Sequence, residues 1–275
     1  MSFNFLESLN ENQKKAVLQT SGPLLILAGA GTGKTKVLTT RLANILQNRL
    51  ANPFETLTVT FTNKAASEMK QRVEEMLKIG TDGWWIGTFH AMGVRILRKH
   101  PELVGLKRQF SIIDIDDQIR LVKQALSYHN VDEKRWPAKL LHSIIQRWKD
   151  KGYNPEDAPD DQEFGNVNGK KIYRTYQDRL LTLNVVDYGD LLLQNINIFK
   201  NNIDVLSLYQ EKFKYILVDE YQDTNICQHT WLKLLAEKYK NICAVGDDDQ
   251  SIYSWRGAEV KNILKFGDTF KNTML

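Results

Sequence analysis

One stretch near the N-terminus combines small residues, a lysine and a threonine in an order suited to binding phosphate. Residues 24–27 are apolar, and residues 28–35 read AGAGTGKT. Glycines let a loop turn its backbone N–H groups inward, and a helix beginning at Lys34 adds the positive end of its dipole. Lys34 can then reach the β- and γ-phosphates, while the Thr35 hydroxyl ligates Mg²⁺. We predict a nucleoside triphosphate site, and the alternative is a glycine-rich turn without a ligand.

A second group of residues supplies carboxylates. The apolar run 215–218 leads directly into Asp219 and Glu220. Asp219 is expected to hold the water shell of Mg²⁺, and Glu220 to polarise the attacking water. Two acids at the end of a strand can equally form a solubilising turn, but the phosphate-binding stretch favours catalysis.

Further along, Gln250 is suited to sensing the γ-phosphate, and Arg256 to binding phosphate as a planar fork.

Aromatic, amide, hydroxyl and basic side chains recur where predicted strands end and in one later loop. Such side chains suit the backbone and stacked bases of single-stranded nucleic acid. The alternatives are a core position for Phe61, a solvated Lys64 and a structural hydrogen bond for His90. The candidate nucleic-acid-binding residues are Phe61, Thr62, Asn63, Lys64, Thr88, Phe89, His90, Tyr253 and Trp255.

Gln13 allows two interpretations. Asn10 and Gln13 have the spacing of a helix capping box. Alternatively, the Gln13 amide reads a base edge of the nucleotide, since it offers one donor and one acceptor in a plane.

The composition is that of an ordinary globular protein. The 275 residues are 42% hydrophobic and 25% charged, so the chain can bury a sizeable core. A net charge of +4 allows a polyanionic partner without requiring one. Cys227 and Cys243 lie in apolar runs, which favours buried free thiols. Because no apolar run has the length of a membrane span and no signal peptide is evident, we expect a cytoplasmic protein without membrane contact.

Strand and helix patterns alternate, which predicts the α/β class with a mostly parallel sheet and the phosphate loop at its C-terminal edge. Between about residues 101 and 204 the patterns become mainly helical. We therefore expect a discontinuous domain, 1–100 and 205–275, interrupted by a helical subdomain, 101–204. Within the insertion, Asp116 resembles a helix N-cap and residues 152–169 a loop. Basic and aromatic residues around 135–136, 147–149 and 170–174 suggest either a DNA-contacting or a merely solvated face.

Together these motifs resemble, in order, those of UvrD/PcrA/Rep-type helicases of superfamily one. The similarity runs from Leu9 to Ala258, nearly the whole chain. The blocks DEYQDTN (219–225) and GDDDQSIYSWRGA (246–258) are much more specific than a phosphate loop alone. The other matching segments are Gln13 and residues 28–35, 60–69 and 87–91.

The resemblance implies a RecA-like P-loop motor domain with a helical accessory subdomain. It also implies use of ATP and Mg²⁺, 3′-to-5′ tracking on single-stranded DNA, and unwinding at single-strand/duplex junctions in repair or replication. Ala28 replaces the glycine of the strict loop pattern, and Lys36 stands where relatives often carry arginine. The implied nucleotide-binding residues are Gln13, Ala28, Gly29, Ala30, Gly31, Thr32, Gly33, Lys34, Thr35 and Lys36. The implied metal residues are Thr35 and Asp219, and the implied catalytic residues are Lys34, Glu220, Gln250 and Arg256.

The later motifs of these helicases, which belong to a second RecA-like domain with arginine fingers, have no counterpart here. Loss of such an arginine costs about 10³- to 10⁵-fold in rate in comparable NTPases. We therefore expect the chain alone to bind ATP and DNA weakly without unwinding duplexes, and to need the C-terminal motor domain as a partner. Three alternatives stay open: a nucleotide- and DNA-binding module without turnover, the motor of a helicase–nuclease, and RNA as the substrate.

Overall fold

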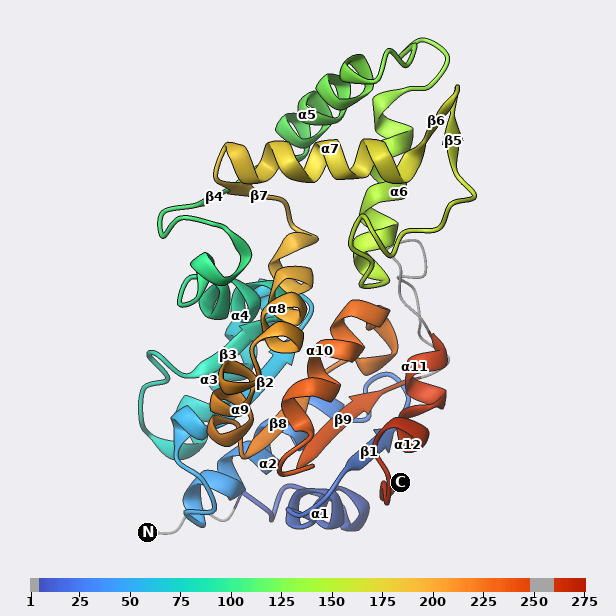
Figure 1. Ribbon diagram of the computed structural model, residues 1–275. Helices are drawn as coiled ribbons and strands as arrows, with labels where there is room; N and C mark the ends of the chain where they lie inside the picture. Colours follow the sequence, from blue (N-terminus) through green and yellow to red (C-terminus); the bar gives the residue numbers. More distant parts are fainter. Residues whose placement is uncertain (1–4, 248–259) are drawn as a thin grey trace. The chain divides into compact units, whose positions relative to one another are not determined.

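The computed structural model describes residues 5–247 and 260–275 of the chain. They divide into two compact units (Figure 1). The first comprises residues 1–92 and 202–275, and the second comprises residues 93–201.

The described part of the first unit is built on a five-stranded parallel sheet with the order β1-β9-β8-β2-β3. All-parallel order requires crossover connections, and the strands are almost entirely buried, as in sheets covered on both faces. The predicted α/β class is therefore confirmed. The strands are β1 (Leu24–Leu27), β2 (Thr56–Thr60), β3 (Trp85–Thr88), β8 (Tyr215–Val218) and β9 (Ile242–Gly246).

Helices cover both faces of this sheet, as β3 illustrates. Successive side chains of a strand point to opposite faces. Ile86 packs with the residues of α2 and α3, whereas the ring of Trp85 lies 6.4 Å from that of Tyr209 on α9. The helices of this unit are α1 (Glu11–Leu18), α2 (Lys34–Gln47), α3 (Asn63–Leu77), α9 (Ile203–Lys212), α10 (Ile226–Ala236), α11 (Val260–Leu264), α12 (Phe266–Thr269) and the short 3₁₀ turns η1 (Pro53–Glu55) and η3 (Tyr221–Asp223).

The second unit is mainly helical and has its own hydrophobic core, formed by α5, α6 and α7. α4 (Phe89–Leu97) begins in the first unit and ends in the second. The other elements of the second unit are η2 (Pro101–Val104), β4 (Ser111–Ile112), α5 (Ile115–Tyr128), α6 (Ala138–Asp150), β5 (Glu163–Phe164), β6 (Val167–Asn168), α7 (Gly169–Thr182), β7 (Val185–Val186) and α8 (Asp190–Asn201).

Two local predictions for this unit are corrected. The N-cap of α5 is Asp114 rather than Asp116, because the Asp114 carboxylate accepts a hydrogen bond from the backbone N–H of Asp117. Residues 152–169 are not loop throughout, since β5 and β6 pair there as a small antiparallel hairpin.

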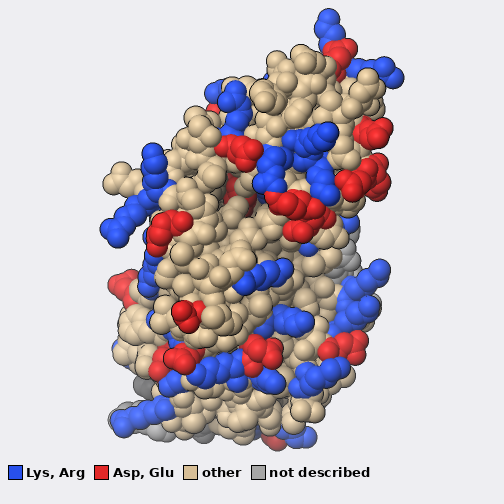
Figure 2. All heavy atoms as spheres, in the orientation of Figure 1, with Lys and Arg blue, Asp and Glu red and all other residues tan. Residues whose placement is uncertain are grey.

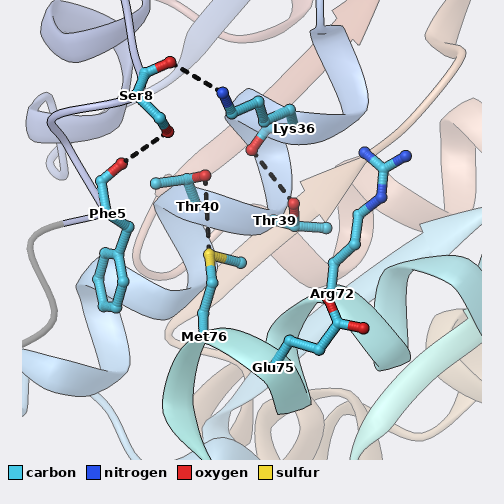
Figure 3. A pocket seen from close by; sticks show the side chains of 8 residues that line it. All are labelled: Phe5, Ser8, Lys36, Thr39, Thr40, Arg72, Glu75 and Met76. Carbon is cyan, nitrogen blue, oxygen red and sulfur yellow. Dashed lines mark hydrogen bonds between the residues drawn. The ribbon is translucent and has the colours of Figure 1, made fainter.

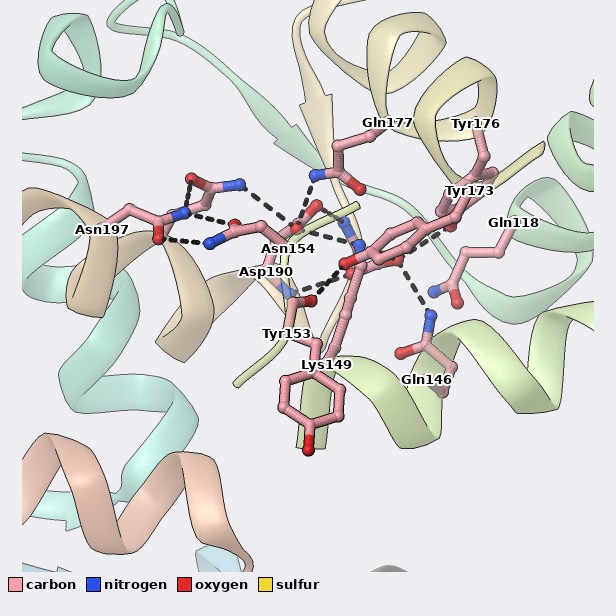
Figure 4. A network of polar contacts seen from close by, with 12 residues as sticks. Gln118, Gln146, Lys149, Tyr153, Asn154, Tyr173, Tyr176, Gln177, Asp190 and Asn197 are labelled. Atoms are coloured by element: carbon pink, nitrogen blue, oxygen red, sulfur yellow. Dashed lines mark hydrogen bonds and ion pairs between the residues drawn. The ribbon is translucent and has the colours of Figure 1, made fainter. Parts of the chain in front are cut away.

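A buried ionic network joins α6, α7 and α8 (Figure 4). Lys149 Nζ lies 2.7 Å from Asp187 Oδ2 and 2.9 Å from Asp190 Oδ1, and all three side chains are buried. The Tyr176 hydroxyl and the Gln146 amide also donate to Asp187. Burial alone lowers the pKa of Lys149, but the two carboxylates outweigh it and raise that pKa. Lys149 is thus an internal cation and not part of a basic face.

Basic residues in this unit often lie beside acids. Arg174 pairs with Glu156, and Lys170 Nζ lies 3.4 Å from Asp160 Oδ1. On the face drawn in Figure 2, lysine and arginine side chains are interspersed with aspartate and glutamate. The small net positive charge therefore does not form one continuous basic surface on that face. Cys227 and Cys243 are free and buried, as predicted.

No helix within residues 5–247 and 260–275 combines the length and the apolar character needed to cross a membrane.

Candidate nucleotide site

The predicted phosphate loop connects β1 to α2 at the C-terminal edge of the sheet. Gly31 and Gly33 have φ angles of 72° and 87°, in the left-handed region that glycine adopts without strain. Gly33 is the N-cap of α2, so the helix begins at Lys34 and directs its first N–H groups at the loop. Within the loop, the Thr32 hydroxyl donates to the Gly29 carbonyl at 2.7 Å. The local geometry is that of an anion site at a helix N-terminus.

Lys34 lies inside the loop rather than in solvent. Its ammonium donates to the carbonyls of Ala28 at 2.7 Å and Gly29 at 3.1 Å, and lies 3.8 Å from Asp247 Oδ2. Its side chain is only 8% exposed. A nearly buried cation held by carbonyl oxygens is a strong electrostatic partner for an incoming phosphate, because little solvent screens it.

The Gln13 side chain takes part in the N-terminal capping box of α1 and also contacts the phosphate loop. Its side chain accepts from the Asn10 backbone N–H, and the Asn10 side chain accepts from the Gln13 N–H, which confirms the capping box. The Gln13 amide also donates to the Thr32 carbonyl at 2.9 Å. Gln13 is therefore positioned beside the phosphate loop, while base reading remains a prediction.

The two carboxylates follow β8, and one of them reaches α2. The Thr35 hydroxyl donates to Asp219 Oδ2 at 3.2 Å, although the two residues are far apart in sequence. Burial and the neighbouring Glu220 raise the pKa of Asp219 to about 6. Burial and Glu220 thus raise the free energy of the ionised Asp219 carboxylate, and a bound cation would lower it again.

Glu220 occupies an uncommon backbone conformation. Its φ of 50° places it in the left-handed region, where a side chain other than glycine is strained. Its side chain is half-buried, and Gln222 donates to Glu220 Oε2 at 2.7 Å. Strained residues often occur at functional sites, which is consistent with the predicted catalytic role.

A pocket of about 360 Å³ lies against these groups. Thr35, Asp219 and Glu220 line it together with the end of β2 and two charged residues of α3, Glu68 and Arg72. Neither α3 residue is among the predicted site residues, although Glu68 lies in the matching segment 60–69. Asp223, within the block 219–225, is not among the predicted site residues either; it lines the pocket, and burial and Glu220 raise its pKa to about 6.

A second pocket, of about 340 Å³, lies between α2, α3 and the N-terminal segment (Figure 3). Lys36 and Arg72 both line it, so Arg72 borders both pockets. Lys36 Nζ donates to the Ser8 carbonyl at 2.8 Å, which holds this cation near the start of α2.

The predicted DNA-binding residues gather at the ends of two neighbouring strands. Thr60 and Thr88 are paired in the β2–β3 register, so the residues that follow them lie at one edge of the sheet. Thr62, Asn63 and Lys64 are exposed, and Phe61 is partly exposed. The hydroxyls of Thr62 and Thr88 accept backbone N–H groups at the starts of α3 and α4.

Two aromatic predictions at this edge need adjustment. Phe89 is only 1% exposed, and its ring lies 5.3 Å from Phe61 and 6.1 Å from Trp231. Phe89 is therefore a core residue that supports Phe61, and we remove it from the DNA-contacting set. Burial lowers the pKa of His90 to about 4, so its imidazole is neutral at pH 7 and would contact DNA without a positive charge.

The remaining predicted residues, Gln250, Tyr253, Trp255 and Arg256, lie outside the described residues.

Comparison with known proteins gives the family. Residues 9–271 match the family described as "UvrD/REP helicase N-terminal domain". DNA helicase II of Rickettsia typhi is 54% identical over 272 residues, which cover 97% of this chain and 41% of that protein. The ATP-dependent DNA helicase PcrA of Staphylococcus epidermidis is 45% identical over 266 residues, covering 96% of this chain and 36% of that protein.

The chain thus spans at most 41% of the length of these two relatives. Its parallel sheet, its phosphate loop and the match to the family pattern lead to one conclusion. The chain belongs to the UvrD/REP helicase family and corresponds to its N-terminal domain.

Proposed function

We propose that the chain is the N-terminal, ATP-binding part of an ATP-dependent DNA helicase. In this proposal it tracks 3′-to-5′ on single-stranded DNA in the cytoplasm and unwinds junctions during repair or replication. The observation that carries the proposal is the contact between the Thr35 hydroxyl and the Asp219 carboxylate at 3.2 Å. It joins the phosphate loop to the carboxylate pair, which are the two halves of an NTP-hydrolysing site.

The residues present fit ATP with Mg²⁺. Mg²⁺ in nucleotide sites usually takes one or two protein oxygens and completes its shell with phosphates and water. Thr35 and Asp219 supply one hydroxyl and one carboxylate, and the part of the chain that the structure describes holds no larger metal-binding cluster of acids, histidines and cysteines. When bound, Mg²⁺ would neutralise charge that develops on the phosphates.

Each residue of the site is proposed to contact a different part of the nucleotide or the attacking water. Lys34 exchanges its loop carbonyls for the β- and γ-phosphates, which keeps the ammonium hydrogen-bonded throughout. Glu220 orients and polarises the attacking water. Gln13 and Lys36, both beside the loop, are proposed to contact the base end of the nucleotide. Gln250 and Arg256 are proposed to act on the γ-phosphate.

DNA is proposed to cross the C-terminal ends of β2 and β3. Phe61 offers a stacking platform, while Asn63, Lys64, Thr88 and His90 offer polar contacts to the backbone. Tyr253 and Trp255 are proposed as further platforms, and Thr62 lies beside Phe61 at the same edge.

We predict that Phe61→Ala weakens binding of single-stranded DNA. Stacking of a base on an aromatic side chain contributes about 1–3 kcal/mol, so the Kd should rise roughly 5- to 150-fold. Fluorescence anisotropy with a labelled single-stranded oligonucleotide measures this Kd. Phe54→Ala is the matched control, because Phe54 is 49% exposed but precedes β2 and so lies at the other end of the strand. Equal losses in both variants would rule out the proposed surface.

We also propose that a second motor domain completes the catalytic site. Phosphoryl transfer needs charges positioned around the whole transferring group. Within residues 5–247 and 260–275, Lys34, Asp219 and Glu220 all come from one edge of a single sheet.

The test of the proposed function is ATP hydrolysis with and without single-stranded DNA, using Lys34→Ala. We expect DNA-stimulated turnover when the proposed second motor domain is present, and its loss in Lys34→Ala, because the variant removes the cation from the loop. Lys70→Ala, on α3, is the control for a lysine placed outside the loop. Nucleotide binding without turnover even in the presence of that domain would favour the non-hydrolysing module, and stimulation by RNA alone would change the substrate. Turnover that survives Lys34→Ala would overturn the proposed site.

A further inference from the structure

Gln222 links two strand ends beside the catalytic carboxylate. It lies on η3, and its side chain is nearly buried, with 2% of the residue exposed. Its Nε2 donates to Glu220 Oε2 at 2.7 Å, and its Oε1 accepts from the backbone N–H of Asp247 at 3.1 Å. Since Glu220 follows β8 and Asp247 follows β9, one side chain connects both ends.

The orientation of this amide is determined by its partners. The backbone N–H of Asp247 can only donate, so it must face the carbonyl oxygen of the amide. The NH₂ group is thereby directed at Glu220, whose ionised carboxylate can only accept. A reversed amide would lose both hydrogen bonds, so Gln222 has one stable arrangement.

The backbone around Gln222 makes room for this arrangement. A Cβ atom at Gly246 would lie 2.6 Å from Gln222 Oε1, so a residue larger than glycine would displace the amide. Among the described residues, Gln222 is also the hydrogen-bond partner of the Glu220 carboxylate. Without it, and within the part of the chain that the structure describes, the half-buried Glu220 side chain on its strained backbone would have no other hydrogen bond to hold its rotamer.

We propose that Gln222 is a positioning residue that holds the Glu220 carboxylate in the orientation needed to polarise the attacking water. The inference rests on the proposed ATP hydrolysis. Through the Asp247 backbone, Gln222 also connects Glu220 to the segment whose carboxylate lies 3.8 Å from Lys34 Nζ. Glu220 and Lys34 are therefore both connected to Asp247, the residue that follows β9.

The test compares two substitutions of Gln222 with a matched control. Gln222→Met keeps the length of the side chain but removes both hydrogen bonds. Gln222→Glu keeps an acceptor for the Asp247 N–H but turns a carboxylate toward Glu220, which replaces attraction by repulsion. Gln228→Met is the control, since Gln228 is another buried glutamine nearby but belongs to the capping box of α10.

We expect kcat for ATP hydrolysis to fall roughly 10- to 100-fold in both Gln222 variants, because small misplacement of a catalytic group costs up to about 100-fold. The Kd for a fluorescent ATP analogue should change little, because the described hydrogen bonds of the Gln222 side chain go to Glu220 and to the Asp247 backbone and not to the phosphate loop. Gln228→Met should lower the melting temperature without lowering kcat to the same extent. Unchanged kcat in Gln222→Met, or an equal loss in Gln228→Met, would refute the positioning role.

A double variant separates positioning from general structural damage. If Gln222 acts through Glu220, then adding Gln222→Met to Glu220→Gln should leave kcat where the single Glu220→Gln variant has it. A further loss in the double variant would show that Gln222 acts by another route. Absence of Lys34-dependent hydrolysis in the unsubstituted protein would instead overturn the proposed function, and this inference with it.

Discussion

Replacing Glu220 with glutamine should lower kcat for ATP hydrolysis about 10²- to 10⁴-fold, the range in which a positioned general base contributes. Glutamine keeps the shape of the side chain and can still bond to Gln222, but it cannot accept a proton from the attacking water. Nucleotide affinity should be retained, because Lys34 and the loop are unaltered. The measurement is steady-state hydrolysis at saturating single-stranded DNA, with nucleotide binding titrated in parallel.

The control for this prediction is Glu237→Gln, at the exposed C-cap of α10. That change removes one negative charge from the same unit without touching the pocket. If both variants hydrolyse ATP at the unsubstituted rate, Glu220 is not the catalytic carboxylate. If Glu220→Gln loses nucleotide binding as well, its role is in assembling the loop and not in the chemical step.

Replacing Lys149 with methionine should destabilise the second unit by about 3–5 kcal/mol, the usual cost of removing one partner of a buried ion pair. Methionine fills similar space, but Asp187 and Asp190 would be left buried together without a cation. One of them would have to bind a proton or draw in water. The loss should exceed that of a typical point mutation, which is about 1 kcal/mol.

Amide hydrogen exchange reports this effect locally. Protection should decrease in α6, α7 and α8, because the network joins those three helices. Lys151→Met provides the comparison, since Lys151 is exposed just after α6. Similar exchange in the two variants would show that the buried network does not hold the unit together.

Local sequence patterns predict the structure of this protein best where near neighbours in the chain dictate it. The apolar runs ending at Leu27, Val218 and Gly246 are strands, and Asn10 with Gln13 forms the predicted capping box. Glycines at 31 and 33 occur where the loop needs positive φ angles. These features depend on hydrogen bonds and torsions between near neighbours, so a short stretch of sequence contains the necessary information.

Burial and long-range contacts could not be predicted in the same way. Lys149 reads as part of a basic run, but it is an internal cation because residues 187 and 190 approach it from elsewhere in the unit. Phe89 reads as a DNA contact, but its ring is buried against Trp231. Asp114, not Asp116, caps α5, because the helix begins at Ile115, two residues earlier than a cap at Asp116 would place it.

The sequence by itself determined the α/β class, the phosphate loop and the chemical types of the groups around it, because motif residues and strand patterns are local. Only the tertiary structure decided which of those groups meet. Thr35 reaches Asp219 because parallel strands deliver their C-terminal ends to one edge of the sheet. Gln222 reaches both Glu220 and Asp247 because β8 and β9 are neighbours in that sheet, an adjacency that depends on the packing of the whole unit.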